Sequence, residues 1–336
     1  TKEEKDLIKK MIHMVNPGDC REIRETLNMT EKGTVKNSME NYVTVLRKDP
    51  LLAGSLRYNR LTEKIDVTKI LWWNKEPCVL TNKGRKALRY FFEKYYGLFN
   101  EGVMDDALDL EAYSKEYHPI CEYLETLEWD GKERIRNVLK VYMGAEDSDL
   151  VYEMLKHFMM GALNRIYCPG CKFDEMLCLV GQQGAGKSTF FRFLALDDQW
   201  FSDSLKNLNM EKPYELLRGH WILEMSEMTA AISAKSIEET KSFLSRMKET
   251  HRNPYEKYEE DRPRQCVFAG SSNNRQFIPF DRTGARRFLP IEIDSSKAEK
   301  HILDDEPEAR ECFDQLWAEA MVLFNATGNK SELLRF

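Results

Sequence analysis

The chain has 336 residues, of which 42% are apolar and 32% are charged, so we expect a substantial core and more than one domain. The formal net charge of −6 excludes a basic footprint over the whole chain, so any nucleic-acid site has to be local. No run of about 18 apolar residues is present, and the opening segment lacks the apolar core of a signal peptide. We therefore expect a cytoplasmic protein without a membrane span.

The eight cysteines are scattered, which suits reduced thiols in a chain of this size. Cys168-Pro169-Gly170-Cys171 has the spacing of a redox motif or of half a zinc site. The sequence holds no second pair at such spacing, so a four-ligand zinc site would lack half its ligands. The motif therefore predicts a turn and no zinc.

Residues 1–75 predict a small mixed α/β region. Two short polar helices are broken at Asn16-Pro17-Gly18, and residues 38–47 have helical periodicity. Asp49 precedes a proline, which disfavours the α conformation and should end that helix. Residues 56–67 predict two short strands around a polar turn.

Residues 76–167 are expected to be helical, because apolar residues recur there at positions i, i+3, i+4 and i+7. Asp147 or Ser148 is a suitable N-cap for the last of these helices. A cluster of aromatic residues in this region could form a stacking platform for bases, but the one-sided helical spacing favours core packing. Its members are Tyr90, Phe91, Phe92, Tyr95 and Tyr96.

Beyond Cys168-Pro169-Gly170 the pattern changes, and residues 168–336 predict an α/β domain. Short apolar runs alternate with helical or loop segments. Runs of this length between turn residues are typical of strands buried on both faces of a largely parallel sheet. They occupy residues 176–180, 221–225, 265–270 and 287–293.

The segment after the first run matches the phosphate-loop pattern GxxxxGK(S/T). Glycines let the backbone form a nest whose N–H groups face phosphate oxygens, and the positive end of the next helix faces the same oxygens. Lys187 is expected to reach the β- and γ-phosphates, and the Ser188 hydroxyl to ligate Mg²⁺. A chance glycine-rich turn is the alternative, but the strand–loop–helix context favours ATP with Mg²⁺. The predicted nucleotide-binding residues are Gly181, Gln182, Gln183, Gly184, Ala185, Gly186, Lys187, Ser188 and Thr189.

Two acids follow the second apolar run. Glu224 ends this buried strand, and Glu227 comes three residues later. A carboxylate at the end of such a strand is expected to hold the hydration shell of Mg²⁺ opposite Ser188, and a second one to polarise the attacking water. The alternative is that both acids are merely solvated or paired with neighbouring cations. The pattern leaves open which acid has which role.

Polar residues after the last two runs complete the predicted site. Asn273 follows the third run and is expected to place its side-chain dipole between the γ-phosphate and the water, with Asn274 as the second choice. The alternative is an ordinary turn. Arg286 and Arg287 precede the last run, where one guanidinium is expected to stabilise the transition state of a neighbouring subunit's ATP.

These motifs together resemble the virulence-associated protein E family of phages, prophages and pathogenicity islands. The resemblance is strongest over residues 117–320 and weaker over 36–75. The segments that carry it are YHPICEYLETLEWDGKERI, CPGCKFDEMLCLVGQQGAGKSTF, WFSDSL, LRGHWILEMSEM, KSFLSR, PRQCVFAGSSNN, TGARRF and FDQLWAEA.

The resemblance implies an AAA+-like P-loop ATPase, related to the superfamily III helicases and acting in DNA replication of a mobile element. It places Lys187 and Ser188 on the Walker A motif, Glu224 and Glu227 on Walker B, Asn273 on sensor 1, and Arg286 or Arg287 on the arginine finger. It also implies a homo-oligomer, a hexameric ring, that acts on single-stranded or forked DNA with a host or phage replication protein as a further partner. Two departures are notable: the Walker B strand ends in Glu rather than Asp, and the chain stops at Phe336, so we expect a C-terminal truncation.

Residues 241–265 are the expected DNA-binding segment, because the resemblance places them at the pore of a ring. Stacked rings of basic side chains there would hold the backbone of a single strand. Five acids in the same segment leave a solvated loop of mixed charge as the alternative. The basic residues are Lys241, Arg246, Lys248, Arg252, Lys257, Arg262 and Arg264, interleaved with Tyr255 and Tyr258.

The sequence therefore predicts an oligomeric, DNA-dependent ATPase that works as a helicase or in replication initiation. One alternative is an ATP-dependent assembly switch that binds a protein partner without moving along DNA, which the net negative charge favours. A small-molecule kinase is the other alternative, but the sequence offers no arginine-rich lid for it.

Overall fold

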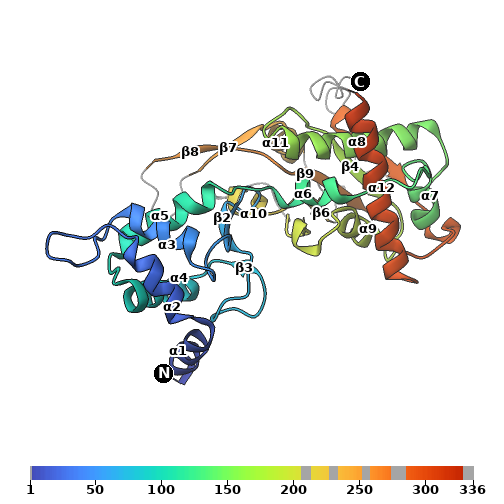
Figure 1. The fold of residues 1–336 in the computed structure, drawn as a ribbon. Coiled ribbons are helices and arrows are strands. Elements are labelled where there is room, and N and C mark those ends of the chain that lie inside the picture. The colour runs from blue at the N-terminus through green and yellow to red at the C-terminus, as the bar shows by residue number, and fades with distance from the viewer. Residues whose placement is uncertain (1, 206–212, 227–233, 252–257, 274–284, 328–336) are drawn as a thin grey trace. The chain divides into compact units, whose positions relative to one another are not determined.

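The computed structural model describes the chain except for residues 1, 206–212, 227–233, 252–257, 274–284 and 328–336 (Figure 1). It divides into two compact units, Thr1–Pro119 and Ile120–Phe336. The boundaries expected from the sequence, after residues 75 and 167, differ from this division. The division differs because elements on both sides of each predicted boundary pack against one another within a single unit.

The first unit combines helices with a small antiparallel sheet of order β1-β2-β3. The strands are β1 (Leu56–Asn59), β2 (Lys64–Val67) and β3 (Cys78–Val79), and the helices are α1 (Lys2–Met14), α2 (Pro17–Glu25), α3 (Met39–Lys48), α4 (Asn82–Phe91), the π-helix η1 (Phe92–Tyr96) and α5 (Glu101–Tyr113). The predicted break at Asn16, the helix that ends at Asp49 and the strand pair over 56–67 are confirmed.

The core of the first unit joins elements on both sides of residue 75, which explains why no boundary lies there. α5 packs on α3 and β1, and β3 pairs with β2. Of the aromatic cluster, Phe91, Phe92 and Tyr96 are fully buried, so the expectation of core packing is confirmed for them, whereas Tyr90 is 39% exposed.

The second unit is built around a five-stranded parallel sheet of order β10-β4-β9-β6-β5. Its strands are β4 (Met176–Val180), β5 (Phe201–Ser202), β6 (Ile222–Met225), β9 (Val267–Ser272) and β10 (Phe288–Glu292). The four apolar runs therefore form parallel strands, as predicted; β4, β6 and β9 are buried throughout, whereas the edge strand β10 is only partly buried. A separate hairpin of β7 (Lys248–His251) and β8 (Glu260–Pro263) lies between β6 and β9 in the chain.

Helices supply the rest of the second unit. These are α6 (Pro119–Thr126), α7 (Val138–Met143), α8 (Asp149–Tyr167), α9 (Lys187–Leu194), α10 (Pro213–Leu217), α11 (Ala234–Leu244) and α12 (Glu306–Ala326), with the short 3₁₀ helices η2 (Asp198–Trp200), η4 (Ala285–Arg287) and η5 (Ser295–Lys297).

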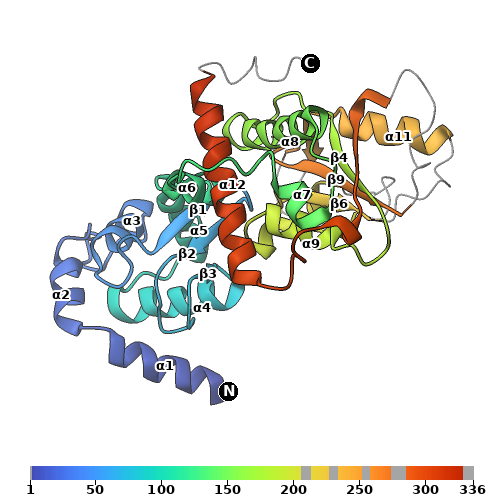
Figure 2. The ribbon, with the colours of Figure 1, turned by 90° about the vertical axis from the view of Figure 1, so that its right-hand side faces the viewer.

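Helices cover both faces of this sheet. Met176, Leu223 and Phe268 share one hydrophobic cluster with Phe243 of α11 and Leu217 of α10. Since side chains alternate along a strand, the intervening residues point to the opposite face, which α8 and α9 contact. The long helix α12 lies against α8 and α9 there (Figure 1 and Figure 2).

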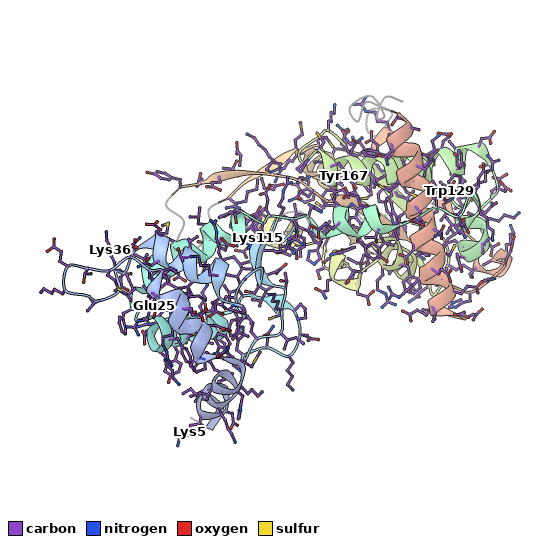
Figure 3. All side chains as sticks on the ribbon, viewed as in Figure 1. Lys5, Glu25, Lys36, Lys115, Trp129 and Tyr167 are labelled. Carbon is purple, nitrogen blue, oxygen red and sulfur yellow. The ribbon has the colours of Figure 1, made fainter. Side chains whose placement is uncertain are left out.

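Helix α8 belongs to the sheet unit because its contacts are there. The indole N–H of Trp221 donates to the Ala162 carbonyl, at 3.1 Å, and the Trp221 ring packs on Trp317 of α12. Tyr167, labelled in Figure 3, is the last residue of α8. Its ring packs on that of Phe324 of α12, with centroids 5.6 Å apart. A boundary at residue 167 would separate these partners.

Two further predictions concern helix ends and turns. The Ser148 side chain accepts from the backbone N–H of Val151 and caps α8, so Ser148 rather than Asp147 is the cap. The predicted turn at Cys168 is confirmed, since the N–H of Cys171 donates to the Cys168 carbonyl and Gly170 has a φ of +78°. Among the described residues, no helix is long and apolar enough to span a membrane.

Candidate nucleotide-binding site

The glycine-rich loop connects the end of β4 to the start of α9. Gly184 and Gly186 both have a φ of +79°, a left-handed conformation that favours glycine. A Cβ atom on Gly181 would lie 2.5 Å from both the carbonyl oxygen and Cγ1 of Ile293. The loop thus needs glycine for its backbone shape at two positions and for close packing at a third.

Lys187 begins α9 and is held beneath this loop. Its Nζ donates to the carbonyls of Gly181 and Gln182, both at 2.8 Å, and to Oδ1 of Asn273 at 2.9 Å. The residue is only 8% exposed. Burial lowers the pKa of Lys187, and the nearby Glu224 carboxylate opposes that shift. All three described hydrogen-bond partners of Nζ are neutral oxygens, and the nearby charge that favours the ammonium form is the Glu224 carboxylate.

Glu224 is fully buried near the end of β6. Its Oε1 accepts hydrogen bonds from Ser188 Oγ at 2.9 Å and from Ser271 Oγ at 2.5 Å. Its Oε2 is buried and has no hydrogen-bond partner among the described residues. Burial raises the pKa of Glu224, and the two hydroxyl donors oppose this shift. An acceptor atom left open in this position fits a further ligand.

The strand order explains why these side chains meet. β9 lies between β4 and β6, and all three strands run parallel, so their carboxyl ends form one edge of the sheet. The loop leaves β4, Asn273 follows β9, and Glu224 lies near the end of β6. Ligands of open α/β sheets bind outside this carboxyl edge.

Ser271 is the residue that sequence reasoning missed. Glu224 is paired in register with Ala269, and Ser271 follows two residues later on the same side of β9. Strand alternation contained this signal, because it separates Ser271 from Ser272. The partner of Ser271 could not be found without the strand order.

The side chains at the carboxyl edge suit Mg²⁺ better than a metal ion that is surrounded entirely by protein ligands. Among the described residues, no group of three His, Cys, Asp or Glu side chains could hold a metal ion. Mg²⁺ commonly takes one or two protein ligands and completes its shell with water and phosphate oxygens. The Ser188 hydroxyl and Oε2 of Glu224 could serve as two such ligands.

Of the remaining predicted site residues, the structure describes Arg286 and Arg287, and it places both away from this edge. Glu227 and Asn274 lie outside the described residues. Arg286 and Arg287 precede β10, whose first residue pairs with Met176 at the start of β4, so both lie at the opposite, amino edge of the sheet. Arg287 donates to Oδ2 of Asp174 at 2.9 Å, whereas Arg286 is exposed.

The hairpin of β7 and β8 uses most of its described basic side chains internally. Lys248 pairs with Asp261, and Arg264 is 3% exposed and paired with Glu249. Arg262 is only 8% exposed. Arg252, Tyr255 and Lys257 lie outside the described residues, while Tyr258 is 69% exposed. The number of basic residues in the segment thus overstates its free positive charge.

Comparison with known proteins identifies the family. A model of the virulence-associated protein E-like domain matches residues 124–334. The chain belongs to the virulence-associated protein E family. No curated protein matches it.

Solved structures support the fold of this family member. The A-form apo structure of the NrS-1 C-terminal region matches with a TM-score of 0.52 and 14% identity, over 89% of this chain and 72% of that chain. A second A-form apo structure of the same region matches with a TM-score of 0.50 and 14% identity, over 84% and 72% of the two chains. At this identity the likeness concerns the fold alone.

Proposed function

We propose that the chain is an ATP-hydrolysing, DNA-dependent AAA+-like ATPase that acts as a helicase or in replication initiation of a phage or mobile element. The observation that carries the proposal is the convergence of Lys187, Ser188, Glu224 and Asn273 at one edge of the parallel sheet. The family membership supports the biological setting, because the resemblance implies replication of a mobile element.

Each side chain has a defined part in this reaction. Lys187 exchanges its carbonyl partners for the β- and γ-phosphates. Ser188 and Glu224 would hold Mg²⁺, and the bound ion would supply positive charge to neutralise the phosphate oxygens. Asn273, already bonded to Lys187, directs its amide toward the γ-phosphate and the attacking water. Glu227 is the proposed base.

The position of the arginines favours an oligomer. Gly181 lies five residues beyond Met176, which pairs with the first residue of β10. At about 3.3 Å per residue the two edges are roughly 16 Å apart. An arginine at the amino edge therefore serves a neighbouring subunit's nucleotide, as in a ring, and Arg286 is the proposed finger because Arg287 is already engaged. This placement also argues against a kinase with a cis-acting arginine lid.

DNA is the proposed polymer substrate, bound by the segment that connects β7 to β8 in the chain. Since the described basic side chains of the hairpin are largely paired or buried, contact with a single strand depends on Arg252, Lys257 and Tyr258. The pairing of these basic side chains with acids, together with the net charge of −6, favours the alternative function. In that alternative the chain is an assembly switch that binds a protein such as a replication factor.

ATP turnover with and without single-stranded DNA tests the proposal, on protein whose oligomeric state is measured in parallel. We expect Mg²⁺-dependent turnover that single-stranded DNA raises. Turnover that is indifferent to DNA but changes with subunit assembly would favour the switch. Absence of ATP binding by calorimetry would overturn both.

A further inference from the structure

A buried ion pair at the amino edge of the sheet joins three segments. Asp174 lies just before β4, and its Oδ2 accepts from Arg287 Nε at 2.9 Å. Ser245, directly after α11, completes the contact: its Oγ is 3.3 Å from Asp174 Oδ2 and 3.2 Å from Arg287 Nε. Residues separated by up to 113 positions in the chain are thus held together.

The pair is well shielded from water. The side chain of Asp174 is 10% exposed and that of Arg287 is 18% exposed. Removal of one partner from such a pair leaves an uncompensated charge away from solvent, whereas an exposed pair is worth little. The contact therefore fixes the position of Arg287.

The segment that carries Asp174 is itself anchored. Arg165 of α8 donates through Nη2 to the Phe173 carbonyl at 2.7 Å. The Phe173 ring lies where a Cβ atom on Gly161 would stand, at 2.2 Å, so α8 and this segment are in close contact. Asp174 is consequently a rigid reference point for the short 3₁₀ helix that ends at Arg287.

None of these groups can act on the nucleotide of its own subunit, since they lie at the edge opposite the glycine-rich loop. The residue next to Arg287 in the chain is Arg286, the proposed arginine finger, and it is exposed. A catalytic group misplaced by about 1 Å can cost on the order of 10²-fold in rate. An exposed arginine needs a fixed backbone to be placed that accurately.

We propose that Asp174 is a positioning residue, which through Arg287 and Ser245 directs Arg286 toward the nucleotide of the neighbouring subunit. This inference rests on the proposed function of Arg286. It also gives Arg287 a role: it anchors the finger and does not itself contact the nucleotide.

The test uses Asp174→Asn, which keeps an oxygen acceptor and removes the charge. We expect kcat for ATP to fall about 10- to 100-fold while KM for ATP and the oligomeric state stay unchanged. The neighbouring subunit should be able to relieve the defect in trans. With excess Lys187→Ala subunits, which cannot use ATP but present an intact Arg286, turnover per Asp174→Asn subunit should rise toward the wild-type value.

Two controls make this rescue specific. Arg286→Ala subunits should be rescued in the same mixture, because they lack only what the neighbour supplies. Glu224→Gln subunits should not be rescued, because their defect lies in their own site. Ser245→Ala removes a single hydroxyl, and we expect it to give a smaller fall in kcat with the same rescue.

Two results would overturn the inference. One is wild-type kcat in folded Asp174→Asn protein, and the other is a loss that co-assembled Lys187→Ala subunits do not relieve. Should Asp174→Asn fail to fold, Ser245→Ala decides the matter by the same two criteria. Failure of the underlying proposal has a different signature, since Arg286→Ala alone would then leave ATP turnover unchanged.

Discussion

The two edges of the five-stranded sheet differ in how completely their polar groups are paired. At the carboxyl edge, the described hydrogen-bond partners of Lys187 are all neutral, and Oε2 of Glu224 is buried without a hydrogen-bond partner among the described residues. At the amino edge, Arg287 and Asp174 satisfy one another, and Arg286 faces solvent. The difference makes the first edge the candidate ligand site, whereas the described polar groups of the second pair with one another and leave Arg286 exposed.

The largest expected effect is that of Lys187→Ala at the carboxyl edge. Loss of the ammonium group removes the charge that balances the β- and γ-phosphates, so ATP binding or hydrolysis should be abolished. Calorimetry and phosphate release measure the two. Lys172→Ala, at an exposed lysine of the same unit, is the matched control and should leave both unchanged. Wild-type affinity and turnover in Lys187→Ala would contradict the assignment of this edge.

Arg286→Ala tests the amino edge. We expect kcat to fall about 10³-fold while ATP binding is retained, because an arginine supplied in trans acts on the transition state. A second variant, Arg287→Ala, should lower the melting temperature, because it leaves the buried Asp174 carboxylate without its cationic partner. Turnover of the wild type should rise with protein concentration, and a fully active monomer would refute a shared site.

Glu224→Gln and Glu227→Gln separate the two acids. Glu224→Gln removes a unit charge beside Ser188, so Mg²⁺-dependent ATP affinity should fall roughly 100-fold. Glu227→Gln should keep ATP bound and stop turnover, because a base is needed only for hydrolysis. Titration calorimetry with and without Mg²⁺, together with phosphate release, distinguishes these results. Exchanged phenotypes would reverse the assignment.

Ser271→Ala has the smallest expected effect. It removes the hydroxyl that donates to Glu224 Oε1 and leaves Ser188 as the remaining donor. Loss of a group that orients a metal ligand costs about tenfold or more in affinity, and we expect a roughly tenfold weaker affinity for Mg²⁺. An unchanged Mg²⁺ titration at an unchanged melting temperature would show that Ser188 alone orients the carboxylate.

Much of the second unit was predictable because its signals are local. Runs of apolar residues predicted β4, β6, β9 and β10, and the glycines predicted the loop between β4 and α9. Helix α8 was expected in a separate helical region, because helical periodicity shows that a face is buried but not what covers it. Its partners, Trp221 and Phe324, lie far away in the sequence.

The sequence by itself determined the parallel sheet and the glycine-rich loop between β4 and α9, because each depends on short-range pattern and backbone conformation. Only the tertiary structure decided that Ser271 serves Glu224 and that Asp174 holds Arg287. Those choices follow from strand order and register, which bring together residues 47 and 113 positions apart. Strand alternation separates Ser271 from Ser272, but no local pattern identifies the distant carboxylate that a serine or an arginine will meet.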